Sequence, residues 1–374
     1  MTWLAFVAGV VLVSLTWASL IATFVSPRGQ SIFQRASSVV QRTVRVALVA
    51  AVRLTPSYAR KDTVLATIGP VALVAQLVVF LATFVLGGAM QLLPWAGSFG
   101  LAVRQSAAAF FVVGLASADG PTNNVIRVLA AATGAITIAL QIGYLPVIYQ
   151  AYAKREALVA LTESRAGVPA WGPEVLMRHQ LVDALGALPG FYRDWEIWSA
   201  DVAESHSTHP VLVLFRSPEV GYSWLLSLLA VLDAAALQLA LCPVAAPSDA
   251  RMCLRMGFSA LRRLATTLRW PYEEDPSPLG PIELDFASFE SAVAQLVGTG
   301  FPAERDAAGA WPHFRGWRVN YEALAYRFAD YLVAPHAPWS GSRLHLPQDV
   351  VPPDRPPHRS PDGGTVDADW LRPR

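Results

Sequence analysis

The chain has 374 residues, of which 53% are hydrophobic and only 15% are charged, and its mean hydropathy is +0.38. This composition excludes an ordinary soluble protein and predicts a membrane protein. The net charge of +1 excludes a bulk electrostatic attraction to nucleic acid, which we do not expect as a partner.

Residues 1–25 carry no charged side chain and are long enough for one membrane helix. A cleaved signal peptide is the alternative, although no basic region precedes the apolar run. The following linker, residues 26–62, contains seven cations against the single acid Asp62. Because cytoplasmic segments of membrane proteins are enriched in arginine and lysine, we expect this linker in the cytoplasm and the N-terminus outside.

The linker contains one helical pattern. Apolar residues recur near helical spacing between residues 32 and 52, and arginines occupy much of the remaining surface. This pattern predicts a helix that lies along the inner leaflet of the membrane, with its arginines near anionic headgroups. A plain connector that packs against the rest of the protein is the alternative.

Two further apolar segments predict membrane spans. The second span is expected from about residue 64 to residue 93, with Gln76 as its only strongly polar side chain. The third span is expected from about residue 125 to residue 152, with Thr122 or Asn123 as its N-terminal cap.

The third span ends on features of a membrane surface. Lys154 and Arg155 follow it and return the chain to the cytoplasm. Three tyrosines near this end are expected in an aromatic belt: Tyr144, Tyr149 and Tyr152. The basic residues after the third span and the odd number of spans after an external N-terminus therefore both predict a cytoplasmic C-terminus.

The stretch between these two spans, residues 94–122, is too short and too interrupted to cross a bilayer twice. It begins with a helix-breaking sequence at 94–97 and a helix cap at Ser98, continues as an apolar run to Val113, and ends in small residues. A helix of about 13 residues reaches about 20 Å, short of the roughly 30 Å hydrocarbon core. Because non-helical backbone at membrane depth is tolerated only inside protein or beside water, this pattern predicts a re-entrant pore loop.

Two spans that flank a half-helix, a turn and a glycine-containing inner helix resemble the two-span potassium channel family. The resemblance covers residues 64–155, under a third of the chain, and the remainder is similar to a bacterial subgroup of ion-channel-like proteins. It implies a homotetramer in which four copies enclose one pore. The pore would conduct a monovalent cation, which is potassium in the family, and would need no cofactor.

The family filter reads T-V-G-Y-G-D, and the resemblance places the ion pathway at six residues of this chain: Val112, Val113, Gly114, Leu115, Ala116 and Ser117. Val112 lacks the threonine hydroxyl, Leu115 replaces the aromatic residue that braces the family filter, and Ala116 replaces its second glycine. Backbone carbonyls would still supply the oxygens that replace an ion's hydration shell. We therefore expect a cation pathway with weak potassium selectivity.

Three further residues near this pathway have two interpretations each. Asp119 predicts either a ring of carboxylates at the outer mouth or an Asp-Gly turn whose side chain caps local backbone. Gly134 and Gly143 are candidate gating hinges of the inner helix, and close helix packing by small residues is the alternative.

Residues 156–335 have the pattern of a soluble domain, which we expect to be all-helical and cytosolic. Six helices are predicted, over residues 173–188, 191–206, 222–241, 248–270, 282–297 and 314–333. Residues 211–215 are the best strand candidate, although no second strand accompanies them. The apolar segment 224–242 resembles a fourth span, but a charge such as Asp233 at its centre costs about 2.5–3.5 kcal/mol in a membrane. We interpret this segment as a buried core helix, with a fourth span as the alternative.

The remaining signals are weak. The tail, residues 336–374, is rich in proline and is expected to be extended or disordered. Glu204, His206 and His209 are residue types that bind metals, but their pattern is more typical of surface residues, and we expect no metal site. The sequence contains no HExxH, CxxC, nucleophile-elbow or phosphate-loop motif, so we expect no enzyme.

These features predict an all-α, multi-pass protein of the cytoplasmic membrane. Its parts are an N-terminal span (1–25), a basic linker (26–62), a pore domain (63–155), a cytosolic helical domain (156–335) and a tail (336–374). The leading hypothesis is a tetrameric pore-loop cation channel in the lipid bilayer, whose cytosolic domain has an unidentified ligand or partner. A non-conducting, membrane-anchored sensor or interaction protein that retains the channel architecture is the alternative, and a membrane enzyme is a third.

Overall fold

The computed structural model describes residues 2–24, 35–53, 55, 57–112 and 121–342. These residues are largely helical and contain no β-strand. The chain forms two compact units. The first contains the described residues of Met1–Pro56, Arg60–Lys154 and Glu204–Phe215, and the second contains those of Ser57–Ala59, Arg155–Ala203 and Arg216–Arg374.

Four helical segments of the described chain are long and apolar enough to cross a membrane, as expected of a multi-pass membrane protein. They are Thr2–Phe24, Tyr58–Ala96, Pro121–Ala166 and Trp224–Leu241. In the first three, only 22%, 39% and 22% of the most apolar window is buried within the protein, whereas 94% of the fourth is buried. The fourth segment is therefore covered by its own protein, and the other three leave apolar surface for another environment.

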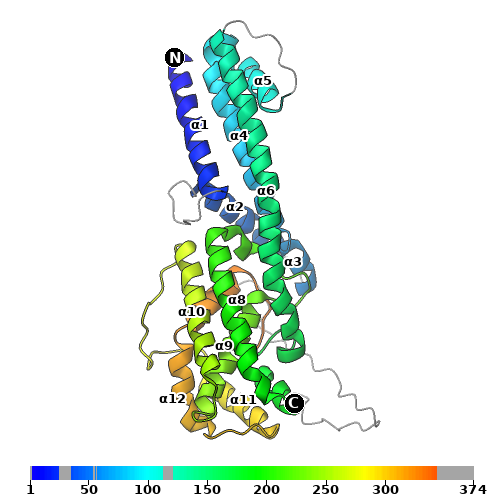
Figure 1. The fold of residues 1–374 in the computed structure, drawn as a ribbon, viewed down its shortest axis with the longest axis vertical. Helices are drawn as coiled ribbons and strands as arrows, with labels where there is room; N and C mark the ends of the chain where they lie inside the picture. The colour runs from blue at the N-terminus through cyan, green and yellow to red at the C-terminus, as the bar shows by residue number, and fades with distance from the viewer. Residues whose placement is uncertain (1, 25–34, 54, 56, 113–120, 343–374) are drawn as a thin grey trace, which may run out of the picture. The chain divides into compact units, whose positions relative to one another are not determined.

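In the first unit, α1 (Thr2–Phe24) packs along α4 (Ile68–Ala96) (Figure 1). Gly9 and Gly87 face each other at this contact, where a Cβ built on Gly9 would lie only 2.6 Å from the carbonyl oxygen of Gly87. Such a close approach of two backbones is typical of helices that pack in membranes.

The second predicted span differs from expectation at both ends. A turn at Ala66 and Thr67 separates α3 (Tyr58–Leu65) from α4, so the helix expected from residue 64 is interrupted. Pro94 was expected to end the helix, but it lies inside α4, which continues to Ala96. Gly97 ends the helix with a φ of +69°, a left-handed conformation that glycine adopts without a side-chain penalty.

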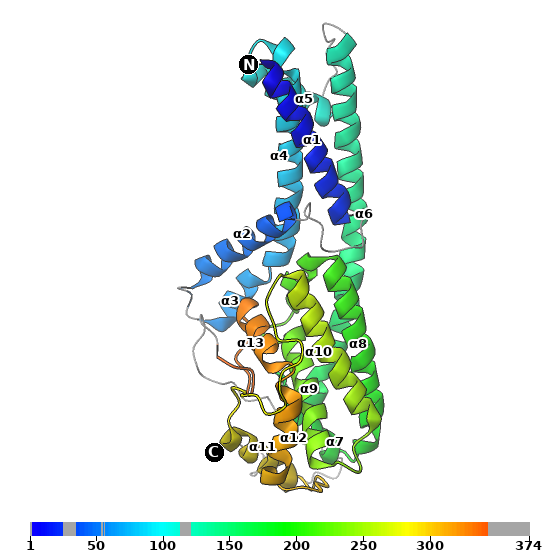
Figure 2. The same cartoon turned by 90° about the vertical axis from the view of Figure 1, so that its left-hand side faces the viewer.

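The helix predicted in the basic linker is present as α2 (Arg35–Val52), which runs in a different direction from α1 and α4 (Figure 2). Ser37 Oγ lies 3.0 Å from Thr23 Oγ1 of α1, and Gln41 donates from Nε2 to Gln76 Oε1 of α4 at 3.4 Å. The only strongly polar side chain of the second predicted span is therefore satisfied inside the first unit. The location of α2 at a membrane surface stays a prediction.

The third predicted span is part of a much longer helix, α6 (Pro121–Ala166), which has 46 residues. It begins at Pro121, so Thr122 and Asn123 lie inside its first turn and do not cap it. Proline is tolerated there because the first amides of a helix have no partner within it. The helix continues past Tyr152 because no breaker occurs before Gly167, and its residues from Arg155 onward belong to the second unit.

The second unit is a helical bundle around α9 (Trp224–Leu241). Its other α-helices are α7 (Gly172–Leu181), α8 (Leu188–Thr208), α10 (Ser248–Thr267), α11 (Phe286–Gly298), α12 (Ala307–Arg318) and α13 (Glu322–Tyr331), and a short 3₁₀ helix, η2, covers Leu185–Ala187. Helices α7, α10, α12 and α13 all pack against α9. This burial agrees with the interpretation of α9 as a core helix.

Two of the expected helices differ from the structure. The helix expected over 173–188 ends at Leu181 as α7, and the helix expected over 314–333 is two helices, α12 and α13. α12 begins earlier than expected because Asp306 accepts a hydrogen bond from the Gly309 amide at 2.7 Å. Residues 211–215, the isolated strand candidate, form a 3₁₀ helix, η3 (Pro210–Leu214), in agreement with the all-helical expectation. A strand needs a neighbour for its backbone hydrogen bonds, and none is present among the described residues.

Candidate functional site

The half-helix predicted between the second and third spans is α5 (Phe99–Phe110), which has 12 residues. Ser98 caps it as predicted, because its Oγ accepts a hydrogen bond from the Leu101 amide at 3.3 Å. At 1.5 Å per residue, α5 is about 18 Å long and cannot cross a hydrocarbon core of roughly 30 Å.

α5 packs along α4, and a polar and an aromatic contact fix the depth of its C-terminal end. Ser106 donates from Oγ to the Val85 carbonyl at 2.8 Å, and the ring of Phe110 stacks on that of Phe84 with 5.9 Å between centroids. Phe84 precedes Ala96, the last residue of α4, by twelve residues, which corresponds to about 18 Å of helix. The C-terminal end of α5 therefore lies beside the middle of α4.

The same end of α5 meets α6 at Gly134, in the middle of the predicted third span. A Cβ built on Gly134 would collide with the carbonyl oxygen of Phe110, so only glycine allows this contact. Gly134 lies thirteen residues after Pro121, about 20 Å into α6. Gly143 differs, because a Cβ built there has no atom within 4 Å. The packing interpretation thus has a specific contact at Gly134 and none at Gly143, while the hinge interpretation stays a prediction for both.

Val112 is the one predicted ion-pathway residue that the structure describes. It follows the C-terminal end of α5, its side chain is 59% exposed, and its φ is +56°. A left-handed backbone is unusual for a β-branched residue and costs of order 1–3 kcal/mol. The other predicted residues lie outside the described part of the chain: Val113, Gly114, Leu115, Ala116, Ser117 and the outer-mouth candidate Asp119.

α6 buries one stripe and exposes the opposite one. The buried positions recur at helical spacing: Asn123, Ile126, Arg127, Gly134, Thr137, Tyr144 and Ile148. Ile126 packs in a cluster with Ala102 of α5, so the stripe faces the half-helix near its start. The exposed positions include large apolar residues: Val125, Val128, Leu129, Ile136, Ile142, Leu145 and Val147. One copy of the chain leaves this second face uncovered.

Arg127 is a residue that the sequence analysis missed. It lies inside the expected third span and is only 5% exposed. Ionisable residues within membrane helices are rare and usually functional, so a search for charge inside each span would have found it. It directly follows Ile126, which packs with Ala102 near the start of the half-helix.

An aromatic cluster surrounds Tyr144 near the middle of α6. The Tyr144 ring lies 4.7 Å from that of Phe24 and 5.2 Å from that of His209, and its hydroxyl is 3.3 Å from His209 Nδ1. Tyr144 is buried in these contacts, whereas Tyr149 is largely exposed, so only part of the predicted aromatic belt faces outward. Burial holds the pKa of His209 below its usual value, and the ring is neutral at neutral pH.

The three residues considered as metal ligands have separate surroundings. His209 faces Tyr144, whereas His206 Nδ1 lies 2.9 Å from Ser205 Oγ. Each histidine ring therefore has a hydroxyl neighbour of its own, which is the pattern of hydrogen-bonded histidines in a folded segment.

Asp233, whose charge argued against a fourth span, is paired inside the second unit. Arg318 donates to Asp233 Oδ1 at 2.5 Å and to Glu322 Oε1 at 2.8 Å, and Tyr321 donates to Asp233 Oδ1 at 2.8 Å. The Arg318 side chain is fully buried. Arg318 at the end of α12 and Tyr321 before α13 therefore both reach Asp233 of α9, and Arg318 also binds Glu322 of α13.

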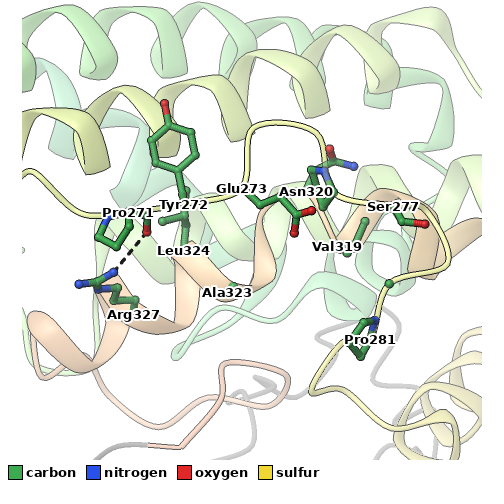
Figure 3. Close-up of a pocket in the computed structure, with 12 residues that line it drawn as sticks. Pro271, Tyr272, Glu273, Ser277, Pro281, Val319, Asn320, Ala323, Leu324 and Arg327 are labelled. Atoms are coloured by element: carbon green, nitrogen blue, oxygen red, sulfur yellow. Dashed lines mark hydrogen bonds between the residues drawn. The ribbon is translucent and has the colours of Figure 1, made fainter.

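The second unit also contains a pocket of about 440 Å³, which is within the range of small-molecule sites. It lies between the loop that starts at Pro271 and the first turns of α13 (Figure 3). Arg327 donates from Nη1 to the Pro271 carbonyl at 3.4 Å, and its guanidinium lies 4.5 Å from the centroid of the Trp270 ring. Glu273 adds the opposite charge to the lining.

Comparison with known proteins adds no name to this arrangement. No protein-family model matches the chain, and no curated protein or solved structure is significantly similar to it.

Proposed function

We propose that the protein is a homotetrameric, pore-loop cation channel of the cytoplasmic membrane, similar to potassium channels but with weak potassium selectivity. The observation that carries this proposal is the depth of α5. The chain leaves α4 at Ala96, and α5 runs back along α4 until Phe110 lies beside Phe84 in the middle of that helix and beside Gly134, about 20 Å into α6. α6 begins at Pro121, and its Ile126 packs in one cluster with Ala96 of α4 and Ala102 of α5, so the start of α6 lies near the start of the half-helix.

The charge at this depth favours a cation. The carbonyl groups at the C-terminal end of a helix carry about half a negative charge, and α5 directs that end toward the middle of the unit. Carbonyl oxygens of the following residues, Val112 to Ser117, would then complete the coordination of an ion. The side chains of Val112, Leu115 and Ala116 add no oxygen, which is why we propose weak selectivity.

The uncovered face of α6 supports assembly into a tetramer. Two spans and one half-helix cannot enclose a pore, and backbone at membrane depth needs protein or water around it. In a tetramer with the four α6 helices around one axis, the exposed stripe that contains Ile136 and Ile142 would be buried against neighbouring copies or would face water in the pore. The burial of α9 supports three spans, and three spans together with the basic linker support a cytoplasmic C-terminus.

A non-conducting membrane sensor is the second candidate. The buried Arg127 favours it, because a fixed positive charge near the half-helix raises the energy of a cation there. The pocket beside Arg327 favours it as well, because a sensor needs a place for its ligand.

Recording from the purified protein in planar bilayers separates the two candidates. We expect wild type to pass potassium and sodium at similar rates and to exclude choline. The triple change Val112→Thr, Leu115→Tyr and Ala116→Gly should raise the permeability of potassium relative to sodium, because it restores a hydroxyl, a bracing aromatic ring and a flexible carbonyl layer. Val220→Thr, the same chemical change at an exposed position of the second unit, is the matched control and should leave the ratio unchanged.

Two outcomes would contradict the proposal. If wild type and the triple variant are both silent while native mass spectrometry finds them tetrameric, the protein is the sensor and not the channel. If wild type already excludes sodium strongly, the proposal of weak potassium selectivity is wrong, whereas the proposal that the protein is a channel still stands.

A further inference from the structure

A short segment of the chain leaves the second unit and returns to the first. Residues 204–215 belong to the first unit, whereas the residues before and after them belong to the second. We call residues 209–215, which contain η3, the insert. Its apolar residues from Val211 to Phe215 are all buried. The insert is therefore part of the core of the first unit, about 50 residues after α6 leaves that unit.

The insert packs against α4 and α6 together. Val211, Leu212 and Phe215 form one buried cluster with residues of both helices: Ala72, Leu73, Tyr144 and Ile148. These positions lie near the first turns of α4 and well past the middle of the predicted third span in α6. The insert thus contacts the start of α4 and the middle of α6, both of which are remote from the half-helix.

Phe215 lies between the start of α4 and residues 149–152 of α6. A Cβ built on Gly69 of α4 would lie 2.5 Å from the Phe215 ring, so the absence of a side chain at residue 69 makes room for it. On the α6 side, the Phe215 ring lies 5.6 Å from the ring of Tyr152 and 6.2 Å from that of Tyr149. Any displacement of Phe215 must therefore change its contacts with both helices.

His209, at the other end of the insert, contacts α6 where that helix is easily bent. Its partner Tyr144 directly follows Gly143 and precedes Pro146 by two residues. Glycine weakens a helix, and a proline inside a helix cannot donate the backbone hydrogen bond to the residue four positions earlier. Kinks in long helices occur at such residues, so the insert holds α6 beside a potential bend.

Arg216, the residue after the insert, is hydrogen-bonded within the second unit. Arg216 donates from Nη2 to the Tyr58 hydroxyl at 2.9 Å and to the Val333 carbonyl at 3.3 Å, and from Nη1 to the Leu332 carbonyl. Leu332 and Val333 follow α13, which also lines the pocket at Arg327. A change at α13 would therefore be transmitted through Arg216 to Phe215, its covalent neighbour.

We propose that the insert couples the second unit to the bend of α6 at residues 143–146, and so controls the opening of the pore at that end. Movement of the chain around Arg216 shifts Phe215 and His209, and α6 responds where its hydrogen bonding is weakest. The mechanism needs only covalent continuity and the packed contacts described above. Its consequence for ion flow rests on the proposed channel function.

Hydrogen exchange of the full-length protein in lipid nanodiscs tests the coupling without any ion current. Phe215→Ala removes the aromatic ring between α4 and α6, and Arg216→Ala removes the side-chain hydrogen bonds of Arg216 within the second unit. We expect both variants to exchange the amides of residues 142–152 about tenfold faster than wild type, because a buried aromatic contact stabilises this stretch against local opening. Arg193→Ala, an exposed arginine of α8, is the matched control and should leave this exchange unchanged.

A general loss of folding is recognised by faster exchange in α9, the core of the second unit. In that case Arg216→Lys replaces Arg216→Ala, because lysine keeps the charge but cannot make the same set of hydrogen bonds. The coupling is overturned if the insert itself exchanges faster in Phe215→Ala while residues 142–152 exchange as in wild type.

Single-channel recording of the same variants tests the consequence for the pore. We expect Phe215→Ala and Arg216→Ala to change the open probability while the current through an open channel stays the same. An unchanged open probability together with faster exchange would overturn the role of the insert in gating. If wild type is silent, the channel proposal fails, and hydrogen exchange alone still decides whether the insert couples the second unit to α6.

Discussion

Two glycines of α6 show how much a single residue depends on its surroundings. Both Gly134 and Gly143 lie in the middle of a long apolar helix, where glycine costs about 1 kcal/mol relative to alanine. At Gly134 the cost is offset, because only glycine lets α6 approach the carbonyl group of Phe110. At Gly143 nothing in the described first unit uses the missing side chain, so its cost is not offset by packing there.

Replacement of each glycine by alanine should therefore affect thermal stability differently at the two positions. Gly134→Ala should lower the thermal stability of the first unit, because the new methyl group forces the end of α5 away from α6. Gly143→Ala should leave stability unchanged or raise it by up to about 1 kcal/mol, because alanine is the better helix former. Thermal unfolding in detergent, followed by circular dichroism, measures both variants. Equal destabilisation by the two changes would contradict the packing contact at Gly134.

At the scale of a helix, α9 shows how a charge is accommodated inside an apolar element. Its surroundings supply Arg318, and through that guanidinium α9 is connected to α12 and to Glu322 at the start of α13. Arg318 also donates to the carbonyl of Trp339 at 2.6 Å, so one side chain joins three helices and the segment after them. A buried group with so many partners positions elements even where its net contribution to stability is small.

Removal of Arg318 should therefore be severe. Arg318→Met keeps much of the side-chain volume but leaves the carboxylates of Asp233 and Glu322 buried without their cation, which typically costs about 3–5 kcal/mol. Arg251→Met, at an exposed position of α10, should change the free energy of unfolding by no more than about 0.5 kcal/mol. Native-state hydrogen exchange of α9 reports both values. Comparable protection of α9 in the two variants would show that the buried ion cluster does not hold the bundle together.

At the scale of the whole molecule, three helical segments leave apolar surface uncovered and one does not. This difference separates helices that need another environment from a helix that the protein covers by itself. Combined with the cations of residues 26–62, it predicts an N-terminus outside the cytoplasm and a second unit inside it.

Labelling of single cysteines from outside intact cells tests this topology. Both native cysteines, Cys242 and Cys253, are buried and should not react. A cysteine at residue 119 should be labelled, because it follows two spans and therefore lies outside. Cysteines at 35, 165 and 263 should not be labelled, because they follow one or three spans and therefore lie on the cytoplasmic side. Labelling at residue 263 would mean that α9 crosses the membrane and that the second unit is not cytosolic.

Local patterns determined which parts of this chain are helical and apolar. Charge-free runs and the cap at Ser98 act over a few neighbouring residues, and these features predicted α1, α5 and residues 125–152 of α6. The interpretation of residues 224–242 as a core helix had a local basis too, because Asp233 is costly in lipid. Even the missed Arg127 was visible in the sequence as a charge inside a predicted span.

Only the tertiary structure decided which distant residues meet. The return of residues 209–215 to α4 and α6, the contact of Gly134 with Phe110, and the pairing of Asp233 with Arg318 join residues that are 24 to more than 140 positions apart. No local period encodes such contacts, because they depend on packing and on the pairing of buried charge across the folded chain. For the same reason residues 211–215, the isolated strand candidate of a domain expected to be all-helical, were ambiguous in the sequence: a short apolar run can form a strand or a buried turn, and its neighbours in space decide between them.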